Sequence, residues 1–414
     1  MVRRTEAGNA GVRSGKSAAR PSSRNAGRRM DSPGASAPER YRSFYDYSLM
    51  FAVVFLTAFG LLMIYSSSSY MAQINPHTNH DAAFYLKRQG MIALGGFVLM
   101  VIVSLMDYHW ILKWSKFAYA LSYVLMTAVM LVGKEVNGKK RWLGVGPLSF
   151  QPTEFAKLAL ILFLTVYIVE KGRRINRWKG IAMLFARAFP IAALVGKNNL
   201  SSGIIILGLG FVMSFVATKK YIVHLVLCAL VGLGVAVINP VSHALLAVGL
   251  LHPYQLSRIL VWQDPARYAQ DGGYQVLQGL YAIGSGGLMG KGLGESIQKM
   301  GFVPEAQNDM IFSIICEELG LFGAVSLILV FLFMIYRFLV IANSAPDLSG
   351  ALLVVGIMAH IAIQVILNIA VVTNTIPNTG ITLPFISYGG TSVLFLMVEM
   401  GIALSVSHSI RADD

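Results

Sequence analysis

The stretch VPEAQNDMIFSIICEELGLFG, residues 303 to 323, leads into the apolar run SLILVFLFMIY at 326 to 336. The run and the residues before it are long enough to cross about 30 Å of hydrocarbon as one helix. Four carboxylates stand at the start of this segment or within it: Glu305, Asp309, Glu317 and Glu318. Because charged groups are costly at membrane depth, each of them needs a partner, water or a function.

Similar apolar runs recur along the whole chain, which has 414 residues, 55% of them hydrophobic and only 13% charged. Ten runs are close to the length of a membrane-spanning helix. They cover residues 47–66, 90–106, 110–132, 154–171, 180–196, 199–217, 221–239, 310–337, 350–372 and 388–408. We therefore predict an all-α polytopic membrane protein with about ten transmembrane helices, in one domain over residues 44–410.

Residues 1–43 differ from the rest in composition. Ten basic and three acidic residues give this tail a net charge of +7, half of the +14 of the chain. The tail is rich in Ser, Gly, Ala and Pro, which predicts disorder. No apolar stretch follows its charges before Leu49, so it lacks the pattern of a secretory signal.

The flanking charges predict the orientation in the cell membrane. The loop KGRRINRWKG at 171–180, the pair Lys219 and Lys220, and Arg337 lie on one side of the predicted spans. Basic residues collect on the cytoplasmic side, so both termini are predicted to be cytoplasmic. The loops 67–89, 133–153, 240–309 and 373–387 are then outside, and the large loop 240–309 joins spans seven and eight.

One outer loop breaks the charge rule. GKEVNGKKRWLGVGPLSFQPTE at 133–154 carries Lys134, Lys139, Lys140 and Arg141. Such a cluster indicates an anionic ligand such as a phosphate. The alternative is that a short translocated loop tolerates a few charges.

Two other outer segments have irregular sequences. Residues 241–260 are apolar with a basic end and predict an interfacial or re-entrant helix. Glycines recur through 272–294, and two prolines and a Gly pair interrupt 376–394, where Ser387 and its neighbours predict a polar lining. Irregular backbone at membrane depth has to line a cavity or be buried in protein, so these segments predict a cleft on the outer side.

Asp309 directly precedes the predicted eighth span. An N-cap role for Asp309 or for Asn308 is the simple explanation. The alternative is a general base at the outer surface, acting on a membrane-tethered substrate.

Glu317 and Glu318 lie about 12 to 13 Å further along that helix. At this depth a structural role is favoured, with Lys157 or Arg187 as buried partners. Glu154 and Lys157 are three residues apart on one helical face and are expected to neutralise each other.

Three strings together resemble one known family. They are KKRWLGVGPLSFQPTEFAKL at 139–158, GLGESIQKMGFVPEAQNDMIFSIICEELG at 292–320 and NTGITLPFISYGGTS at 378–392. They resemble the signatures of the SEDS family (shape, elongation, division and sporulation), which contains FtsW, RodA and SpoVE. The resemblance covers residues from about 44 to 410.

The resemblance implies a ten-span peptidoglycan glycosyltransferase that polymerises lipid II, an undecaprenyl-pyrophosphate-linked precursor, at the outer face of the cell membrane. It implies a class B penicillin-binding protein and other division proteins as partners, and no nucleic acid. The essential aspartate of the family matches Asp309, and its loop tryptophan matches Trp142.

In this chemistry an acceptor hydroxyl loses a proton while a pyrophosphate leaves. A carboxylate takes the proton, which assigns catalysis to Asp309, with Glu305 in the loop that positions it. Cations stabilise the leaving group, and the outer-side candidates are Arg141, Lys139, Lys140, Arg258 and Lys291. No cofactor is evident and no metal-ligand cluster is visible, although phosphate chemistry often recruits Mg²⁺ or Mn²⁺.

The chain departs from the family pattern at two places. GKNNLSSG at 196–203 stands where a QPDLGT-like string is common, so Asn199 replaces an aspartate. QND at 307–309 stands where HTD is common, which removes a His next to the catalytic candidate.

Other functions are open from the sequence. A lipid II flippase would use intramembrane polar residues such as Glu154, Lys157 and Glu317, and a non-enzymatic scaffold would need none of these. An elongation or sporulation enzyme like RodA or SpoVE shares the same motifs, although PEAQND and PFISYGGTS favour a division enzyme like FtsW.

Overall fold

The computed structural model describes residues 42–43, 45–136, 139–145, 148–237 and 253–412. The tail predicted over residues 1–43 lies almost entirely outside these ranges. The long helices are α1 (Tyr47–Ile74), α2 (Phe84–Ser104), α4 (Ser115–Val132), α5 (Pro152–Lys171), α6 (Trp178–Asn198), α7 (Leu200–Ala217), α8 (Tyr221–Ala236), α12 (Ile311–Ser344), α13 (Leu348–Val372) and α14 (Gly390–His408). The short helices are η1 (Pro76–Thr78), α3 (Tyr108–Lys113), η2 (Gly172–Asn176), α10 (Pro253–Gln263), η3 (Ala269–Gly273) and α11 (Tyr274–Gly286).

The predicted class, an all-α polytopic membrane protein, is confirmed. Within the described ranges, 9 helices are long and apolar enough to cross a membrane. They correspond to nine of the ten predicted spans. The predicted seventh span is α8, whose 16 residues reach only about 24 Å before the chain enters the undescribed segment 238–252.

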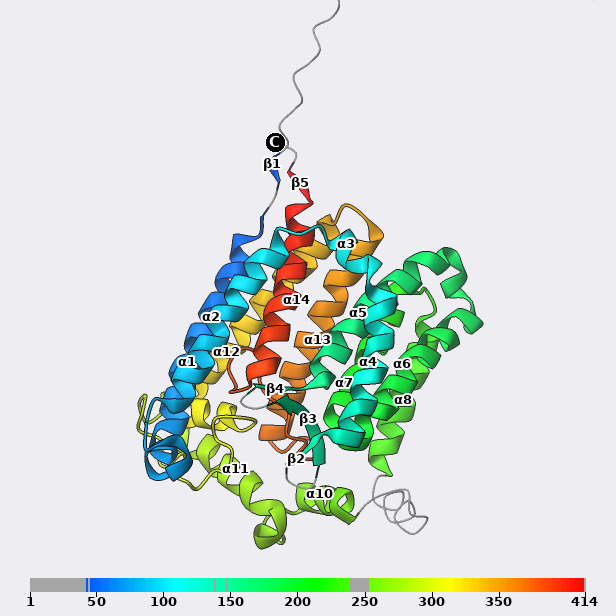
Figure 1. Cartoon of the computed structure of the whole chain (residues 1–414). Helices are drawn as coiled ribbons and strands as arrows, with labels where there is room; N and C mark the ends of the chain where they lie inside the picture. Colours follow the sequence, from blue (N-terminus) through cyan, green and yellow to red (C-terminus); the bar gives the residue numbers. More distant parts are fainter. Residues whose placement is uncertain (1–41, 44, 137–138, 146–147, 238–252, 413–414) are drawn as a thin grey trace, which may run out of the picture. The chain divides into compact units, whose positions relative to one another are not determined.

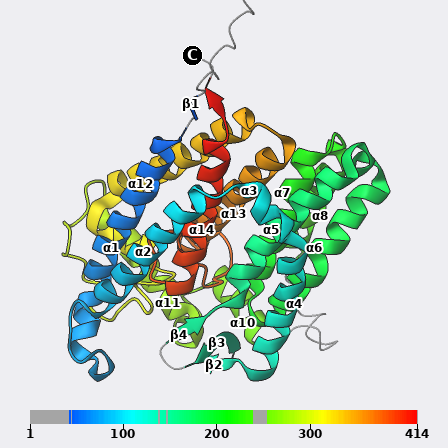
Figure 2. The ribbon, with the colours of Figure 1, turned by 45° about the horizontal axis from the view of Figure 1, so that its top comes forward.

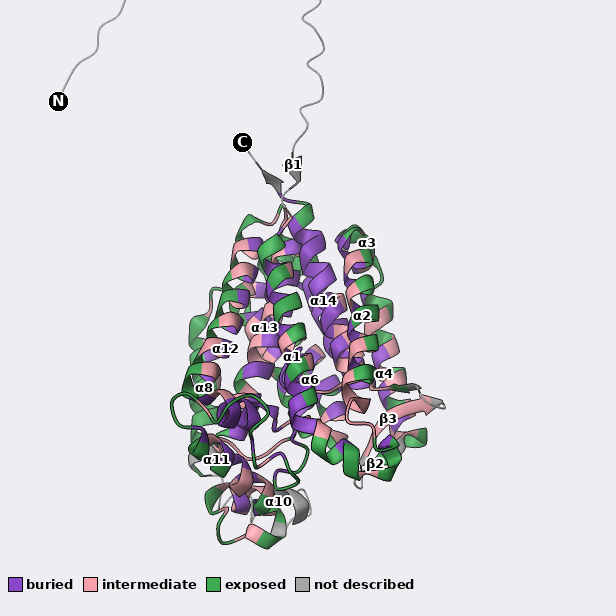
Figure 3. Cartoon of the chain, turned by 90° about the vertical axis from the view of Figure 1, so that its left-hand side faces the viewer, coloured by how far each residue is buried: buried purple, intermediate pink, exposed green. Residues whose placement is uncertain are grey.

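The bundle has a buried centre and a lipid-facing periphery. In α5, α13 and α14, 78%, 67% and 72% of the spanning window is buried, against 28% in α2 and 22% in α4. Figure 2 shows α13 and α14 in the middle, with α1, α2 and α12 on one side and α4 to α8 on the other. The outward apolar side chains of the peripheral helices suit a hydrocarbon solvent, and α14 is buried along its length (Figure 3).

The two described chain ends leave the bundle at the same face. β1 (Arg42–Ser43) pairs antiparallel with β5 (Arg411–Ala412). Figure 1 shows this terminal face at the top, and at the bottom a loop face that carries α10, α11 and a small sheet. The sheet has the order β2 (Lys134–Val136), β3 (Lys139–Val145) and β4 (Leu148–Phe150), and it was not predicted.

The predicted eighth span is longer than expected and is broken. α12 has 34 residues, and Gly320 interrupts it with a φ of 67°. A loop inserts at the break: the amides of Lys291 and Gly292 donate to the carbonyls of Glu317 and Glu318 at 3.0 Å. The insertion satisfies the carbonyls that the break exposes, which is what broken helices at membrane depth require.

The side chains of the same loop neutralise both buried glutamates. Lys291 Nζ lies 2.6 Å from Glu317 Oε1, and Lys299 Nζ lies 2.8 Å from Glu318 Oε1. Both glutamates are 0% exposed. The structural role predicted for them is consistent with this placement, but the predicted partners, Lys157 and Arg187, were wrong.

Candidate active site

The candidate site lies on the loop face, where residues 301–310 and 373–389 meet. Residues 373–389 pass through the protein between α13 and α14, and Leu383, Phe385 and Ile386 within them are buried. Gly60 on α1 permits this path, because a Cβ there would lie 2.5 Å from the carbonyl oxygen of Phe385. The irregular, buried segment predicted at 376–394 is therefore present.

Asp309 sits two residues before α12, on the turn that enters the helix. The N-cap of α12 is Met310, with no side-chain cap bond, so the capping role considered for Asp309 and Asn308 was wrong. Asn308 instead donates from Nδ2 to Glu305 Oε2. Asp309 Oδ1 is buried without a hydrogen-bond partner, while its backbone carbonyl accepts from Asn368 Nδ2 at 2.9 Å. The hydrogen bond from Asn368 fixes the backbone of Asp309, and Oδ1 of its carboxylate can accept a proton.

The surroundings of Asp309 favour its protonated form. Burial raises its pKa from 3.8 to about 7, and the negative charge of Glu305 adds to this rise. The positive charge of Arg258 and the amides of Asp309 and Met310 act in the opposite direction. A carboxylate with a pKa near the working pH is well matched to general base catalysis.

Gly380 covers the carboxylate from the other loop. Its φ is +70°, and a Cβ at this position would lie 3.5 Å from Asp309 Oδ2. Only glycine adopts this conformation without strain while leaving the space beside Oδ2 open.

Three side chains, from the two helices α10 and α7, hold the segment that carries Gly380. Arg258 of α10 donates to the carbonyl of Asn378 at 2.6 Å, and Ser201 of α7 donates to the carbonyl of Thr379 at 2.6 Å. Trp262 of α10 donates to the carbonyl of Asn374 at 3.1 Å. Arg258, predicted as a phosphate ligand, therefore lies beside Asp309 and also shapes the loop over it.

Arg141 contacts the residue pair that precedes α7, the helix that also carries Ser201. Its Nε donates to the carbonyl of Asn198 at 3.1 Å, next to Asn199. Asn199 Oδ1 accepts from the amide of Ser202 at 3.2 Å and caps α7. Asn and Asp cap helices about equally well, which explains how this position can carry Asn in place of the family aspartate.

The remaining predicted cations have different surroundings. Lys140 and Trp142 are half-buried on β3, and Lys140 Nζ donates to the carbonyl of Leu131 at 3.3 Å. The Lys139 side chain lies outside the described residues. Lys291 pairs with Glu317 at the break in α12, and its phosphate contact stays a prediction.

Glu305 and Ser387, both predicted to contact the substrate, have different surroundings in the structure. Glu305 is exposed, has a φ of 55° and acts on Asp309 through its charge. Ser387 is buried, and its Oγ accepts from the amide of Leu383 at 2.7 Å. Ser387 thus stabilises a turn, and its substrate contact stays a prediction.

A cluster at the start of α2 was not predicted from the sequence. The ring of Tyr85 meets that of Tyr388 edge-on at 5.1 Å, and the amide of Tyr388 donates to the carbonyl of Gln307 at 2.9 Å. Burial raises the pKa of the Tyr388 phenol, and the nearby Arg88 guanidinium opposes this rise. Arg88 therefore adds an exposed cation close to the Asp309 turn. Its position near the end of the predicted outer loop 67–89 was the only sequence signal.

A second polar cluster is buried in the bundle. Lys157 Nζ lies 2.9 Å from Glu154 Oε1 and donates to Gln364 Oε1 at 3.3 Å. Lys157 is only 1% exposed. His360, which was not singled out from the sequence, contacts Glu399 Oε2 through Nδ1 at 2.8 Å. The expected Glu154–Lys157 pairing is present.

No group of three or more His, Cys, Asp or Glu residues in the described part of the chain is arranged to hold a metal ion. The Mg²⁺ or Mn²⁺ considered from phosphate chemistry remains an expectation.

These features define a class: a multi-pass membrane protein whose titratable site lies at one membrane face, under a loop that Arg258, Trp262 and Ser201 support. The family model described as "Cell cycle protein", for FtsW, RodA and SpoVE, matches residues 47–412. The chain belongs to this family.

Named relatives and solved structures agree with this membership. Stage V sporulation protein E of Bacillus subtilis is 38% identical over 88% of this chain and 98% of its own length. The protein of the same organism named "Probable peptidoglycan glycosyltransferase FtsW" is 35% identical over 89% and 91%.

Among solved structures, a chain of a peptidoglycan synthase complex that coordinates polymerization and crosslinking is 29% identical, with a TM-score of 0.72 over 89% of this chain and 99% of that one. The rod shape determining protein RodA of Thermus thermophilus is 26% identical, with a TM-score of 0.62 over 89% and 98%.

Proposed function

We propose that this protein is a peptidoglycan glycosyltransferase that polymerises lipid II at the loop face, with Asp309 as the general base. The observation that carries the proposal is the Asp309 carboxylate, with Oδ1 buried and unpartnered and Oδ2 beside Gly380. Family membership and the names of the relatives support the reaction class.

Asp309 would act on the sugar hydroxyl that attacks. As the oxygen of the acceptor 4-hydroxyl bonds to the anomeric carbon of the donor, the carboxylate accepts the hydroxyl proton and the bond from that carbon to the pyrophosphate breaks. Glu305 keeps Asp309 basic enough for this step, because its negative charge raises the pKa of Asp309.

Cations of the loop face would stabilise the pyrophosphate that leaves. Arg258 acts electrostatically on Asp309, and Arg88 lies at the neighbouring Tyr388. Arg141 and Trp142 on β3 are proposed to contact the same substrate from the sheet, with Lys140 and Lys139 beside them. A divalent cation would arrive with the pyrophosphate of the substrate.

The orientation follows from charge. We propose that the terminal face is cytoplasmic, because Lys171, Arg173, Arg174, Arg177, Lys179, Lys219 and Lys220 lie at that end of the helices. The loop face is then the outer face, where lipid II is polymerised.

We also propose a class B penicillin-binding protein as the partner that cross-links the product. The support is the similarity to a chain of a peptidoglycan synthase complex. A division role like that of FtsW is proposed from the PEAQND and PFISYGGTS strings, although the sporulation relative is 38% identical and the FtsW relative of the same organism 35%. Depletion that blocks septa without loss of rod shape supports division, whereas round cells refute it.

The test is polymerisation of labelled lipid II by the purified protein with its partner. Wild type is expected to make glycan chains, and Asp309→Ala to make none while remaining folded, with a cooperative thermal transition. Glu295→Ala, which removes an exposed carboxylate on the same face, is the matched control and is expected to keep activity. Equal polymerisation by wild type and Asp309→Ala would refute Asp309 as the base.

A lipid II flippase is the second candidate, favoured by the buried polar residues Glu154, Lys157 and Gln364. It predicts protein-dependent crossing of lipid II in vesicles without polymerisation. Lys157→Met would then abolish crossing, and Asp309→Ala would leave it unchanged.

A further inference from the structure

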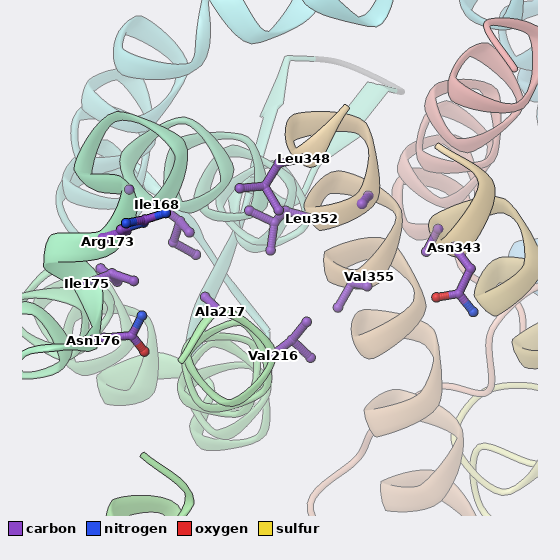
Figure 4. A pocket seen from close by; sticks show the side chains of 13 residues that line it. Ile168, Arg173, Ile175, Asn176, Val216, Ala217, Asn343, Leu348, Leu352 and Val355 are labelled. Carbon is purple, nitrogen blue, oxygen red and sulfur yellow. The ribbon is translucent and has the colours of Figure 1, made fainter. Parts of the chain in front are cut away.

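The terminal face contains a pocket that the proposed reaction does not use. Its volume is about 430 Å³, within the range of small-ligand sites. Figure 4 shows Leu348 and Leu352 of α13 facing Ile168 of α5 and Ala217 of α7 across this space. Most of the lining is apolar, and Arg173 is the one cation among the lining residues.

The rim of this pocket is strongly basic. The segment 171–180 carries five cations and no carboxylate, and Lys219 and Lys220 follow α7. The two segments touch, since the amide of Lys219 donates to Asn176 Oδ1 at 2.8 Å and Lys220 Nζ lies 4.5 Å from the centre of the Trp178 ring. Among the described residues, none of these seven cations forms an ion pair. The rim therefore presents uncompensated positive charge.

The pocket lies at one end of the bundle. It is formed at the ends of membrane-spanning helices, with apolar walls on α5, α7 and α13 and the cations on the loop just beyond. Trp178, 61% exposed on the same rim, is a residue type typical of membrane interfaces.

We propose that this pocket binds an anionic phospholipid of the surrounding leaflet, with an acyl chain between α5, α7 and α13 and the phosphate at Arg173. Charge complementarity favours this occupant over two others. Residues 1–43 carry a charge of +7 and are repelled by the rim. A second copy in a symmetric pair would oppose the same cations to one another.

The test is a titration of the purified full chain with lipids, read as the fraction of protein that retains one lipid in native mass spectrometry. Wild type is expected to retain phosphatidylglycerol in preference to phosphatidylcholine. Arg173→Gln removes the lining cation and is expected to weaken phosphatidylglycerol retention about fivefold, the usual effect of one basic residue near an anionic lipid surface. Ala351→Trp fills the pocket and is expected to abolish the preference.

Lys113→Gln is the matched control, since it removes an exposed cation from α3 at the same face but not at the pocket. Thermal midpoints in lipid-free detergent establish that all variants are folded. Equal retention of both lipids by wild type would overturn the proposal, as would a loss with Lys113→Gln as large as that with Arg173→Gln. Competition by millimolar inorganic phosphate would identify a free-anion site instead, and dissociation of a dimer by Ala351→Trp would identify a protein interface. Either result would also overturn it.

Discussion

Replacing Asp309 by Asn is predicted to stabilise the protein while it abolishes activity. The folded state holds the pKa of Asp309 at about 7 against 3.8 for an ordinary aspartate. Because the pKa is raised, the folded state binds the proton more tightly than the unfolded state does. The cost of the ionised carboxylate is absent below pH 3.8, grows between pH 3.8 and about 7, and is complete above it.

The size of this cost follows from the difference between the two pKa values, 3.8 and about 7. At about 1.4 kcal/mol per pH unit, the difference corresponds to about 4 kcal/mol of unfolding free energy. Because the Asp309 side chain is partly exposed, we reduce the expected cost to about 2 kcal/mol. Asn has nearly the same shape and no charge. We therefore expect Asp309→Asn to raise the free energy of unfolding by about 2 kcal/mol more at pH 8 than at pH 4.

The assay is the thermal midpoint in detergent across this pH range, for wild type, Asp309→Asn and the control Glu295→Gln. The control removes an exposed carboxylate on the same face and is expected to show no such trend. A shift for Asp309→Asn that is independent of pH, or a lower midpoint than wild type at pH 8, would refute the reasoning.

Substitutions at three further positions, Lys299, Gly380 and Asn199, test the framework around the site. Lys299→Met leaves Glu318 buried without its cationic partner and should cost about 3 to 5 kcal/mol in unfolding free energy. Lys87→Met, at the exposed pair with Asp81, should cost less than about 1 kcal/mol, and similar costs for the two variants would contradict the effect of burial. Gly380→Ala imposes about 1 to 2 kcal/mol of backbone strain and places a methyl group in van der Waals contact with Asp309 Oδ2, where it fills the space beside this oxygen, so polymerisation should fall at least about tenfold. Gly272→Ala, with φ +103° and no atom within 4 Å of the added Cβ, should keep activity, and equal effects would refute a role for the space beside Oδ2. Because residue 199 caps α7, Asn199→Asp should change the stability in thermal unfolding by less than about 0.5 kcal/mol, and Asn199→Ala should lower it by about 1 kcal/mol. A large effect of Asn199→Asp would contradict the capping role.

Local patterns in the sequence were sufficient to predict the membrane spans and the position of Asp309 at the end of one of them. A run of about twenty apolar residues has one stable conformation in lipid, so nine predicted spans match helices that are long enough to cross. The end of such a run also places Asp309 at a membrane surface. The three short strands at 134–150 carry no comparable signal, since each has only three to seven residues.

Pairings between distant residues could not be predicted. Lys291 pairs with Glu317 where Gly320 breaks α12 and the 287–292 loop enters, and a glycine within an apolar run does not by itself predict a break. Likewise the spacing rule paired Glu154 with Lys157 correctly, because both lie on one helix. No such rule relates Gly380 to Asp309 or Arg88 to Tyr388, which different elements bring together.

The pH dependence of lipid II polymerisation tests the central claim most directly. If Asp309 is the base, kcat/KM for wild type rises with a single ionisation near pH 7, and Glu305→Gln moves that midpoint to lower pH because it removes the neighbouring negative charge. A profile that is flat between pH 5 and 8, or a midpoint that Glu305→Gln leaves unchanged, would contradict the account.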